Sequence, residues 1–432
     1  MRIAVFILIV IFCHGCSRQQ GLPSADEPGA EYGELVGLKE TPNKSLRDEL
    51  ARIVEERGTP KLLTRELPPN DDNVAAALVD LFPSGGLAAI LSRSEKLFPT
   101  GQFKFSPIEL ECAVHFKKTY DQQRLAARKA LDRPECDFGI LHTAGFLAEL
   151  PFIDVVRICA RLEAFVAAEA LSEDKPAEAL EPFEYMMRLA ACLAAEQRVA
   201  CRMEAAFLRE EALGLLQAIV DHPKVTREDV DRLCQIVEEQ LKTWPKDADV
   251  WIGDRAMGMH AYEVVRDGKI LILLTNEELE EFDKQGILDQ LPKKAKQGID
   301  KDELYYLETM RKVISSCNEP YYRRADLFKE IHKELQQKLD SAEFPIVAGR
   351  MLLADIEKGH AVQARDRARS EAWALALATA SGRKPPVYAT NPLTGKKYRV
   401  VEQDNRIAVW NVGPDRQGEN RPIVVPDLRK KN

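Results

Sequence analysis

Two cysteines near the start of the chain, Cys13 and Cys16, have the C-x-x-C spacing of a thiol–disulfide redox centre. Such a centre depends on a folded α/β scaffold that lowers the pKa of its first cysteine, often at a helix N-terminus. Only Met1 and Arg2 precede the apolar residues 3–12, and the residues after the pair are polar and rich in glycine and proline. Because neither side supplies such a scaffold, we do not interpret the pair as a redox site.

The same segment has the layout of an export signal, with Arg2 as its basic region and residues 3–12 as its apolar region. The apolar run is too short for a membrane-spanning helix, which needs roughly 20 residues. The ending CHGC resembles the lipobox of bacterial lipoproteins, in which the cysteine after a small residue becomes the lipid-modified N-terminus. That cysteine is Cys16 here, and Cys13 stands where the family usually has leucine.

The lipoprotein resemblance implies a signal peptide over residues 1–15 and a membrane-lipid anchor at Cys16. It also implies delivery to the outer rather than the inner membrane, because Ser17 follows the cysteine. An ordinary cleaved signal peptide is the alternative interpretation. Under the lipoprotein interpretation the chain belongs to the cell envelope, is lipid-anchored and faces the periplasm.

The composition is that of a soluble globular protein, with 45% hydrophobic and 30% charged residues. A length of 432 residues suits about two or three domains. The formal net charge of −8 argues against nucleic-acid binding, which needs clustered lysine and arginine. Outside the signal region an odd number of cysteines remains, so a complete set of intramolecular disulfides is impossible and we expect buried thiols. These cysteines are Cys112, Cys136, Cys159, Cys192, Cys201, Cys234 and Cys317.

Most of the chain after residue 43 has the apolar periodicity of amphipathic helices. No fixed repeat appears, so we predict a mainly α fold of irregular antiparallel helical hairpins rather than a solenoid. Segment 264–274 allows either a β-hairpin or a helix that ends at Gly268, and the helical pattern before it favours the helix. The predicted organisation is a signal peptide (1–15), a flexible tether (16–43), a helical domain (44–245), a second helical region (246–381) and a small β module with a tail (382–432).

Local signals predict several helix boundaries. Good helix formers continue through residues 183–223 up to a histidine–proline stop. Thr226 and Asp229 have the spacing of a capping box, in which each side chain satisfies a free backbone N–H of the other residue. Asp300 and Glu303 have the same spacing and predict another helix start.

After Gly382 the sequence changes to short β-rich runs separated by turns that contain proline and glycine. Residues 398–401 and 407–410 predict two antiparallel strands around the turn EQDN, and residues 423–425 predict a third. We therefore expect a small antiparallel sheet to close an otherwise helical protein.

Two motifs stand out in the second half of the chain. The first is IGDRAMG at residues 252–258, which matches a GERAxG-type helix with Asp254 in the usual glutamate position. The second matches the form DPxTGKPLxY…SVGPDG, with Asn391 for the common aspartate and Asn411 for the common serine. Together they resemble a group of uncharacterised, often exported bacterial helical proteins, and the resemblance implies no established activity. The matching positions of the second motif are Asn391, Pro392, Thr394, Gly395, Lys396, Tyr398, Val412, Gly413, Pro414 and Asp415.

Two sets of residues from these motifs are candidate functional positions. For the helical set, helix packing and ion pairing are an equally good explanation. For the C-terminal set, the simpler interpretation is that Asn391 nucleates a turn while Tyr398 and Trp410 pack the sheet onto the helices. The sets are Asp254, Arg255 and His260 in the helix, and Asn391, Tyr398, Trp410 and Asp415 in the C-terminal module.

The C-terminal region also resembles the terminal sheet of type II secretion pseudopilins, whose similar turn precedes a calcium-binding loop in some members. Asp404, Asp415 and Glu419 are the candidate ligands here, and they are too few and too scattered for a hard cation. Pseudopilins begin with a long membrane helix, which this sequence lacks. We therefore predict no metal site and no cofactor.

Motifs that specify a reaction are absent from the sequence, which lacks H-E-x-x-H, G-x-S-x-G, G-x-x-x-x-G-K-[ST] and G-x-G-x-x-G. Glu111, Cys112 and His115 would share a helix face, but a pair of this spacing is more typical of a surface interaction. The charged stretch 330–334 is typical of a solvated helix face, and the basic residues within 365–369 have acidic neighbours. We therefore predict no catalytic residue.

We expect a lipid-anchored helical protein of the cell envelope with a structural or interaction role, which binds another protein and no nucleic acid. The alternative is an envelope hydrolase whose active site is assembled from distant residues. An enzyme should have a deep pocket with converging titratable groups of perturbed pKa. A scaffold should instead present an exposed apolar patch or groove.

Overall fold

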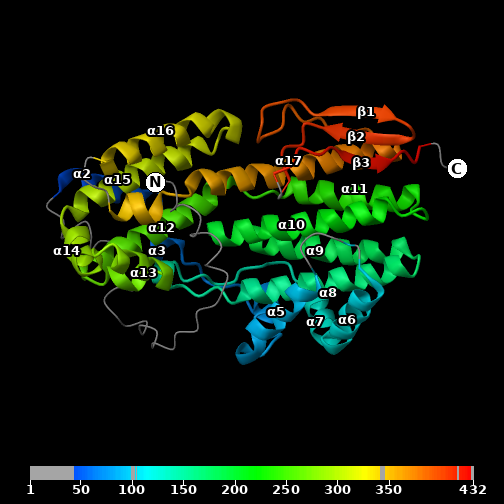
Figure 1. Cartoon of the computed structure of the whole chain (residues 1–432), viewed down its shortest axis with the longest axis horizontal. Helices are drawn as coiled ribbons and strands as arrows, with labels where there is room; N and C mark the ends of the chain where they lie inside the picture. The colour runs from blue at the N-terminus through cyan, green and yellow to red at the C-terminus, as the bar shows by residue number, and fades with distance from the viewer. Residues whose placement is uncertain (1–42, 99–102, 104, 341–345, 416–417, 430–432) are drawn as a thin grey trace.

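The computed structural model describes residues 43–429 except 99–102, 104, 341–345 and 416–417. The predicted signal peptide, the lipidation site Cys16 and nearly all of the tether lie outside these residues. The described chain is mainly helical with a small antiparallel sheet at its C-terminal end, which confirms the predicted fold class. In Figure 1 the long helices lie side by side and the sheet covers the outer side of one of them.

The described helices range from single turns to a helix of 26 residues. Those before residue 225 are α2 (Lys44–Glu55), α3 (Pro60–Leu63), α4 (Val74–Leu78), α5 (Leu87–Leu97), α6 (Pro107–Thr119), α7 (Asp121–Ala130), α8 (Phe152–Ser172), α9 (Leu180–Ala194) and α10 (Val199–Val220). Those after it are α11 (Arg227–Lys242), α12 (Asp247–Arg266), α13 (Asn276–Lys284), α14 (Leu291–Lys296), α15 (Ile299–Ser316), α16 (Tyr321–Asp340) and α17 (Ile356–Ser381). The short segments are the 3₁₀ helices η3 (Ser84–Gly86), η4 (His142–Leu147), η5 (Pro176–Ala179), η6 (Ile270–Leu273) and η7 (Leu288–Gln290) and the π-helical turn η8 (Ala348–Leu352). The strands are β1 (Arg399–Gln403), β2 (Arg406–Trp410) and β3 (Ile423–Pro426).

Buried apolar side chains form two large clusters. The first joins α4–α11 with the C-terminal half of α17 and with strands β2 and β3. The second joins α2, α12 and α14–α16 with the start of α17. Helix α17 belongs to both, because Ile356 is buried in the second cluster and Trp373 in the first. Its 26 residues span about 39 Å at roughly 1.5 Å per residue.

Two helix boundaries lie where local signals predict them. The Thr226 side chain accepts a hydrogen bond from the Asp229 N–H at 3.1 Å, and the Asp229 carboxylate accepts one from the Thr226 N–H at 2.9 Å. Helix α12 ends at Arg266, and Gly268 follows with a φ of 78°. Segment 264–274 is therefore a helix end followed by η6, as expected, and not a hairpin.

The predicted capping box at Asp300 and Glu303 is wrong. Helix α15 begins at Ile299, two residues before the start that a cap at Asp300 predicts, and follows Gly298, whose φ of 80° makes the turn. Asp300 and Glu303 both accept hydrogen bonds from Arg266 on α12, with 3.0 Å to Asp300. Both carboxylates thus have the guanidinium group of a neighbouring helix as a partner.

The helix-forming stretch 183–223 is interrupted in the structure between α9 and α10. Two contacts from α12 hold this interruption. The Asp254 carboxylate accepts a hydrogen bond from the Val199 N–H at 3.2 Å and so caps α10 from outside. Gly253 lies against the Gln197 carbonyl, where a Cβ atom would come within 1.7 Å of the oxygen. The break therefore depends on a tertiary contact and not on a local helix-breaking residue.

The three predicted strands form one sheet in the order β1-β2-β3, with both pairs antiparallel. Asp404 and Asn405 make the β1–β2 turn with φ of 51° and 58°, as a two-residue hairpin turn requires. Ile407 and Val409 on β2 are fully buried, and β2 packs on α17. One face of the sheet thus completes the first hydrophobic cluster.

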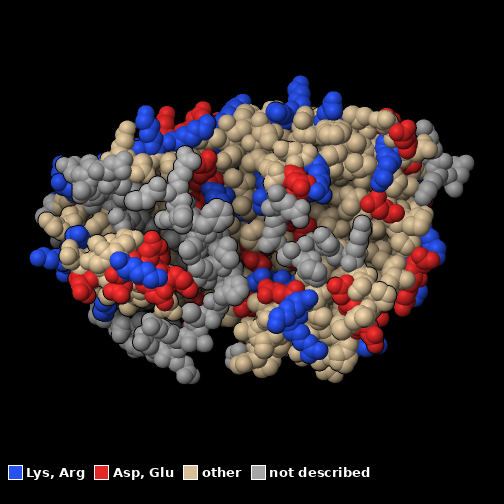
Figure 2. All heavy atoms as spheres, viewed as in Figure 1, with Lys and Arg blue, Asp and Glu red and all other residues tan. Residues whose placement is uncertain are grey.

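The surface carries charges of both signs. On the face shown in Figure 2, lysine and arginine side chains are interspersed with aspartate and glutamate rather than gathered into a separate field. Within the described residues, no helix combines the length and the hydrophobicity needed to cross a bilayer.

Candidate functional site

A cavity of about 180 Å³ lies where the α9–α10 junction meets the residues after α3 and the loop that leads into η4. A cavity of roughly 150 Å³ can hold a benzene-sized group, whereas pockets for drug-sized ligands measure roughly 300–1,000 Å³. The space therefore suits the end of one side chain or one small molecule. Its walls are Leu63, Thr64, Arg65, Leu67, Cys136, Asp137, Gly139, Ile140, Leu141, His142, Ala195, Glu196 and Gln197.

Glu196 is the deeply buried carboxyl group of this pocket, with 8% of its surface exposed. Its Oε1 atom accepts a hydrogen bond from the Phe138 N–H at 2.9 Å. Burial, with a smaller contribution from the charge of Asp137, raises the pKa of Glu196 to about 7. This carboxyl group therefore changes its protonation state near neutral pH, as a general acid–base or a proton-coupled binding group does.

His142 lies at the start of η4 and is 4% exposed. Its Nδ1 atom is buried and has no hydrogen-bond partner within the part of the chain that the structure describes. Burial, followed by the charges of Arg198 and Arg65, lowers the pKa of His142 to about 4. The imidazole is therefore neutral near physiological pH.

Asn73, which caps α4, fixes the loop that carries Cys136 and Asp137. Its side chain accepts a hydrogen bond from the Asp137 N–H at 3.0 Å and donates one to the Asp137 carbonyl at 2.8 Å. The Asp137 carboxylate accepts a hydrogen bond from the Gly139 N–H at 2.8 Å. A hydrogen bond with Cys192, together with burial, raises the pKa of the Cys136 thiol. Cys136 thus remains protonated, and a thiol is a much weaker nucleophile than a thiolate.

The predicted cluster of Asp254, Arg255 and His260 lies on α12, and its members contact three different segments. Asp254 caps α10, and burial raises its pKa to about 6. Arg255 reaches Glu56 after the end of α2 at 3.4 Å. His260 packs against Gly145 in η4, where a Cβ atom would lie 2.3 Å from the His260 Nδ1. The structure places the three side chains on one helix but not in one cavity.

Arg198, which precedes α10, connects the α9–α10 junction with η4. Its Nη1 atom donates a hydrogen bond to the Gly145 carbonyl at 3.3 Å. The charge of Arg198 also opposes the effect of burial on the pKa of Asp254, and burial lowers the pKa of His260. The α12 cluster therefore positions residues 195–198 and η4, and none of its three members lines the pocket.

The C-terminal candidates hold the β module in place. Asn391 is fully buried, and its Oδ1 atom accepts hydrogen bonds from the N–H groups of Leu393 and Thr394 at 2.8 and 3.1 Å. Its Nδ2 atom donates to the Asn411 carbonyl at 2.8 Å. This arrangement is the turn that the simpler interpretation predicts for Asn391.

Tyr398 and Trp410 lie on different sides of the sheet. The Tyr398 hydroxyl donates a hydrogen bond to Glu371 on α17 at 2.9 Å, which ties the sheet to the helices. Trp410 instead is 38% exposed and lies beside the guanidinium of Arg399, 5.6 Å from its ring centroid. Because side chains alternate along a strand, burial of Val409 turns Trp410 outward.

The remaining sequence candidates do not converge on a site. Glu111, Cys112 and His115 are exposed on α6. Asp415 accepts a hydrogen bond from the Glu419 N–H at 2.9 Å. Over residues 43–429 without the gaps named above, no three histidine, cysteine, aspartate or glutamate side chains are arranged to hold a metal ion.

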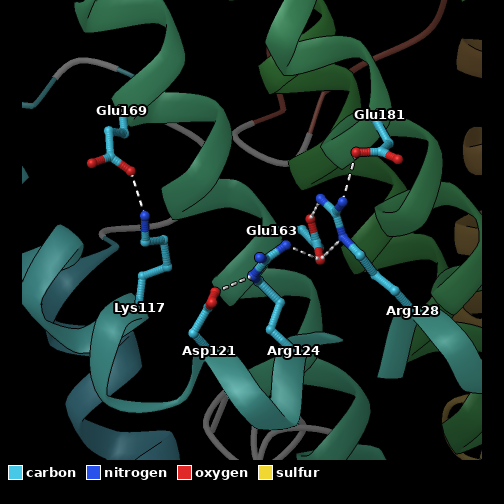
Figure 3. A network of polar contacts seen from close by, with 7 residues as sticks. All are labelled: Lys117, Asp121, Arg124, Arg128, Glu163, Glu169 and Glu181. Carbon is cyan, nitrogen blue, oxygen red and sulfur yellow. Dashed lines mark hydrogen bonds and ion pairs between the residues drawn. The ribbon is translucent and has the colours of Figure 1, made fainter. Parts of the chain in front are cut away.

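A second hollow, about 660 Å³ and widely open, lies over α7, α8 and α9 and has a different chemistry. Glu163 is 2% exposed and accepts hydrogen bonds from Arg128 at 2.7 and 2.5 Å, and Arg124 lies 3.5 Å away. Arg128 also donates to Glu181 at 2.6 Å, and Arg124 to Asp121 at 2.8 Å. Figure 3 shows each of these charged groups pointing toward one of opposite sign. The network is paired within the chain and is therefore structural.

Sequence reasoning missed Cys136, Asp137, His142 and Glu196, which come from separate segments of the chain. No motif spacing connects them, because the fold alone brings them together. One signal was available in the sequence. The polar triplet 196–198 interrupts an otherwise alanine-rich, apolar helical run, and buried polar residues in such a run call for a functional or structural explanation.

No protein-family model, curated protein or solved structure matches this chain.

Proposed function

We propose that this chain is a lipid-anchored helical scaffold of the bacterial cell envelope, whose pocket at the α9–α10 junction receives one side chain of a partner protein. One observation carries the proposal: Glu196 lines the pocket, is 8% exposed and accepts a hydrogen bond there from the Phe138 N–H, with acceptor capacity left over. Buried polar groups are nearly always paired in folded proteins. A bound group that completes this pairing would be stabilised here.

The rim of the pocket favours a protein partner over a freely diffusing substrate. Leu67 and Leu141 line the cavity and are 53% and 58% exposed. Exposed apolar side chains around a polar centre are typical of surfaces on which another protein packs. The volume of about 180 Å³ matches a single anchoring side chain.

The lipoprotein-like N-terminus supplies the proposed location. Cys16 would carry the lipid, residues 16–43 would act as the tether, and the helical body would face the periplasm, from the outer rather than the inner membrane. We expect Cys16→Ser to leave the precursor unprocessed or to release it from the membrane, which fractionation measures. A variant that still fractionates with lipid as the wild type does would contradict the anchor.

A photo-reactive amino acid at Leu141 tests the partner protein directly. We expect one reproducible protein adduct in cells from Leu141 and none from the matched position Ile108, which is 74% exposed on α6. The net charge of −8 predicts that nuclease treatment leaves the adduct intact. Equal adduct yields from the two positions would contradict a specific contact at the pocket.

An envelope hydrolase is the second candidate, and the pKa of Glu196 near 7 favours it. A carboxyl group that titrates close to the working pH is suited to general acid–base catalysis. In that case Glu196→Gln would abolish hydrolysis of an envelope substrate while the fold persists. Hydrolysis that survives this substitution would exclude the pocket as an active site.

A further inference from the structure

The charges around the pocket limit what its occupant can be. Two carboxyl groups, Asp137 and Glu196, share the lining with one cation, Arg65. Arg65 is exposed, and among the described residues no ion pair joins it to either carboxyl group. His142 is neutral near physiological pH and adds no positive charge. The buried cation nearby, Arg198, lies outside the lining and donates a hydrogen bond to the Gly145 carbonyl. An anionic occupant would therefore meet two carboxyl groups of the lining, which is costly.

Hydrogen-bonding capacity favours the same kind of occupant. Glu196 receives the Phe138 N–H, whereas the two oxygens of a carboxylate accept about four hydrogen bonds. Glu196 thus has acceptor capacity left for a bound donor. Ammonium and guanidinium groups are donors only.

The exposed leucines at the opening suit the rest of such a side chain. Lysine and arginine place a charged end on an apolar stem of several methylene groups, which packs on apolar surface. Leu67 and Leu141 line the cavity and are more than half exposed. They are therefore placed to contact the stem while the charged end reaches Glu196.

We propose that the pocket binds the ammonium or guanidinium group of a lysine or arginine side chain of the partner protein, with Glu196 and Asp137 as counter-ions. This inference rests on the proposed function and names its ligand. The ion pair needs ionised Glu196, so binding releases a proton wherever free Glu196 is protonated. Binding therefore strengthens as the pH rises through the titration of Glu196.

The test uses n-butylammonium as the probe for a lysine end and 1-pentanol as its neutral counterpart of similar size. Both are titrated into the whole chain, and binding is followed on the methyl NMR signals of Leu67 and Leu141. We expect n-butylammonium to bind with a dissociation constant of the order of millimolar. Its binding should weaken by roughly tenfold or more between about pH 8 and about pH 5.5.

Two variants complete the test. Glu196→Gln keeps the shape of the side chain and should abolish n-butylammonium binding. Glu178→Gln changes an exposed glutamate, 64% accessible, in the second hollow and should leave the binding unchanged. The pH comparison on the wild-type chain gives the same information if the Glu196 variant does not fold.

Two results would overturn the inference, with different consequences. If 1-pentanol binds as tightly as n-butylammonium at both pH values, the pocket does not prefer a cation. The inference about the ligand is then wrong, while the proposed function remains. If neither probe shifts the signals of Leu67 and Leu141, no group of this size enters. The pocket then loses its proposed function as well.

Discussion

Glu163 and Glu196 are both buried glutamates of the helical body, and their surroundings differ. Glu163 is 2% exposed, and its two carboxylate oxygens each accept a hydrogen bond from the Arg128 guanidinium. Glu196 is 8% exposed and accepts a hydrogen bond from the Phe138 N–H. Burial removes the hydration of each carboxylate, and a guanidinium group compensates for this loss only at Glu163. Glu196 instead keeps a proton until about pH 7.

The comparison distinguishes charged groups that stabilise the fold by pairing with one another from Glu196, which can still pair with a bound group. In the network of Figure 3, residues of α7, α8 and α9 supply one another's counter-ions. In the pocket the described chain provides no counter-ion in contact with Glu196. Natural proteins keep such unfavourable burial chiefly where a site requires it. Four substitutions test this distinction.

The largest effect is expected from Glu163→Gln, which removes the central carboxylate of the paired network. The side chains of Arg124 and Arg128, 11% and 15% exposed, would lose their shared counter-ion. Removing one member of a buried ion pair should lower the free energy of unfolding by about 3 kcal/mol, as measured by urea denaturation. The exposed control Glu178→Gln should change it by less than about 0.5 kcal/mol. Equal stability of Glu163→Gln and Glu178→Gln would contradict a stabilising role of the paired network.

Glu196→Gln should instead raise the free energy of unfolding above neutral pH. The pKa of Glu196 is about 7 in the folded chain and roughly 4.3 in an unfolded one, so stability from this group is complete at low pH and is lost as the pH rises to about 7. The amide avoids that loss. We expect the variant to exceed the wild type by about 2 kcal/mol near pH 8 and to equal it near pH 4. Urea denaturation at the two pH values measures the free energies of unfolding. A Glu196→Gln variant less stable than the wild type near pH 8 would contradict the burial of Glu196 without a counter-ion.

Leu67→Lys would add a second cation to the pocket lining, which already contains the exposed Arg65. An opposite charge within roughly 4–6 Å lowers the pKa of a carboxyl group by about 1–3 units. We expect the pKa of Glu196 to fall by about 1 unit, as followed by pH titration of its side-chain carbon NMR signal. Leu67→Gln is the uncharged control, and an equal shift in both variants would point to altered packing rather than charge.

The smallest effect is expected from Arg65→Gln. The charge of Arg65 lowers the pKa of Glu196 from an exposed position, and salt screens such interactions. We expect the pKa of Glu196 to rise by less than about half a unit at low ionic strength and to match the wild type at about 0.5 M salt. The same NMR titration measures both. A rise that persists in salt would mean that Arg65 acts at close range.

Short-range signals were sufficient for much of the fold. The cap at Thr226, the helix end at Gly268 and the Asp404-Asn405 turn each depend on residues a few positions apart, and the structure contains all three. The break between α9 and α10 could not be predicted, because Asp254 and its neighbours on α12 create it. The failed capping box at Asp300 has the same kind of cause, a partner on another helix.

The candidate site was harder to predict from the sequence than the fold was. Asp254, Arg255 and His260 are close along α12, but residues one and five positions apart point in different directions from a helix. The pocket itself joins segments around residues 65, 137 and 196. Titratable residues from such distant segments carry no common spacing, and their burial becomes visible only after folding.

The first hydrophobic cluster is closed by residues from distant parts of the chain. It contains Val74 and also Val425 and Leu428. A ribosome makes the chain from its N-terminus, so α8–α11 emerge long before the strands that cover them. Such long-range closure is slow, and it leaves apolar surface open in partly made chains. Translation must therefore pass Leu428 before this core can close.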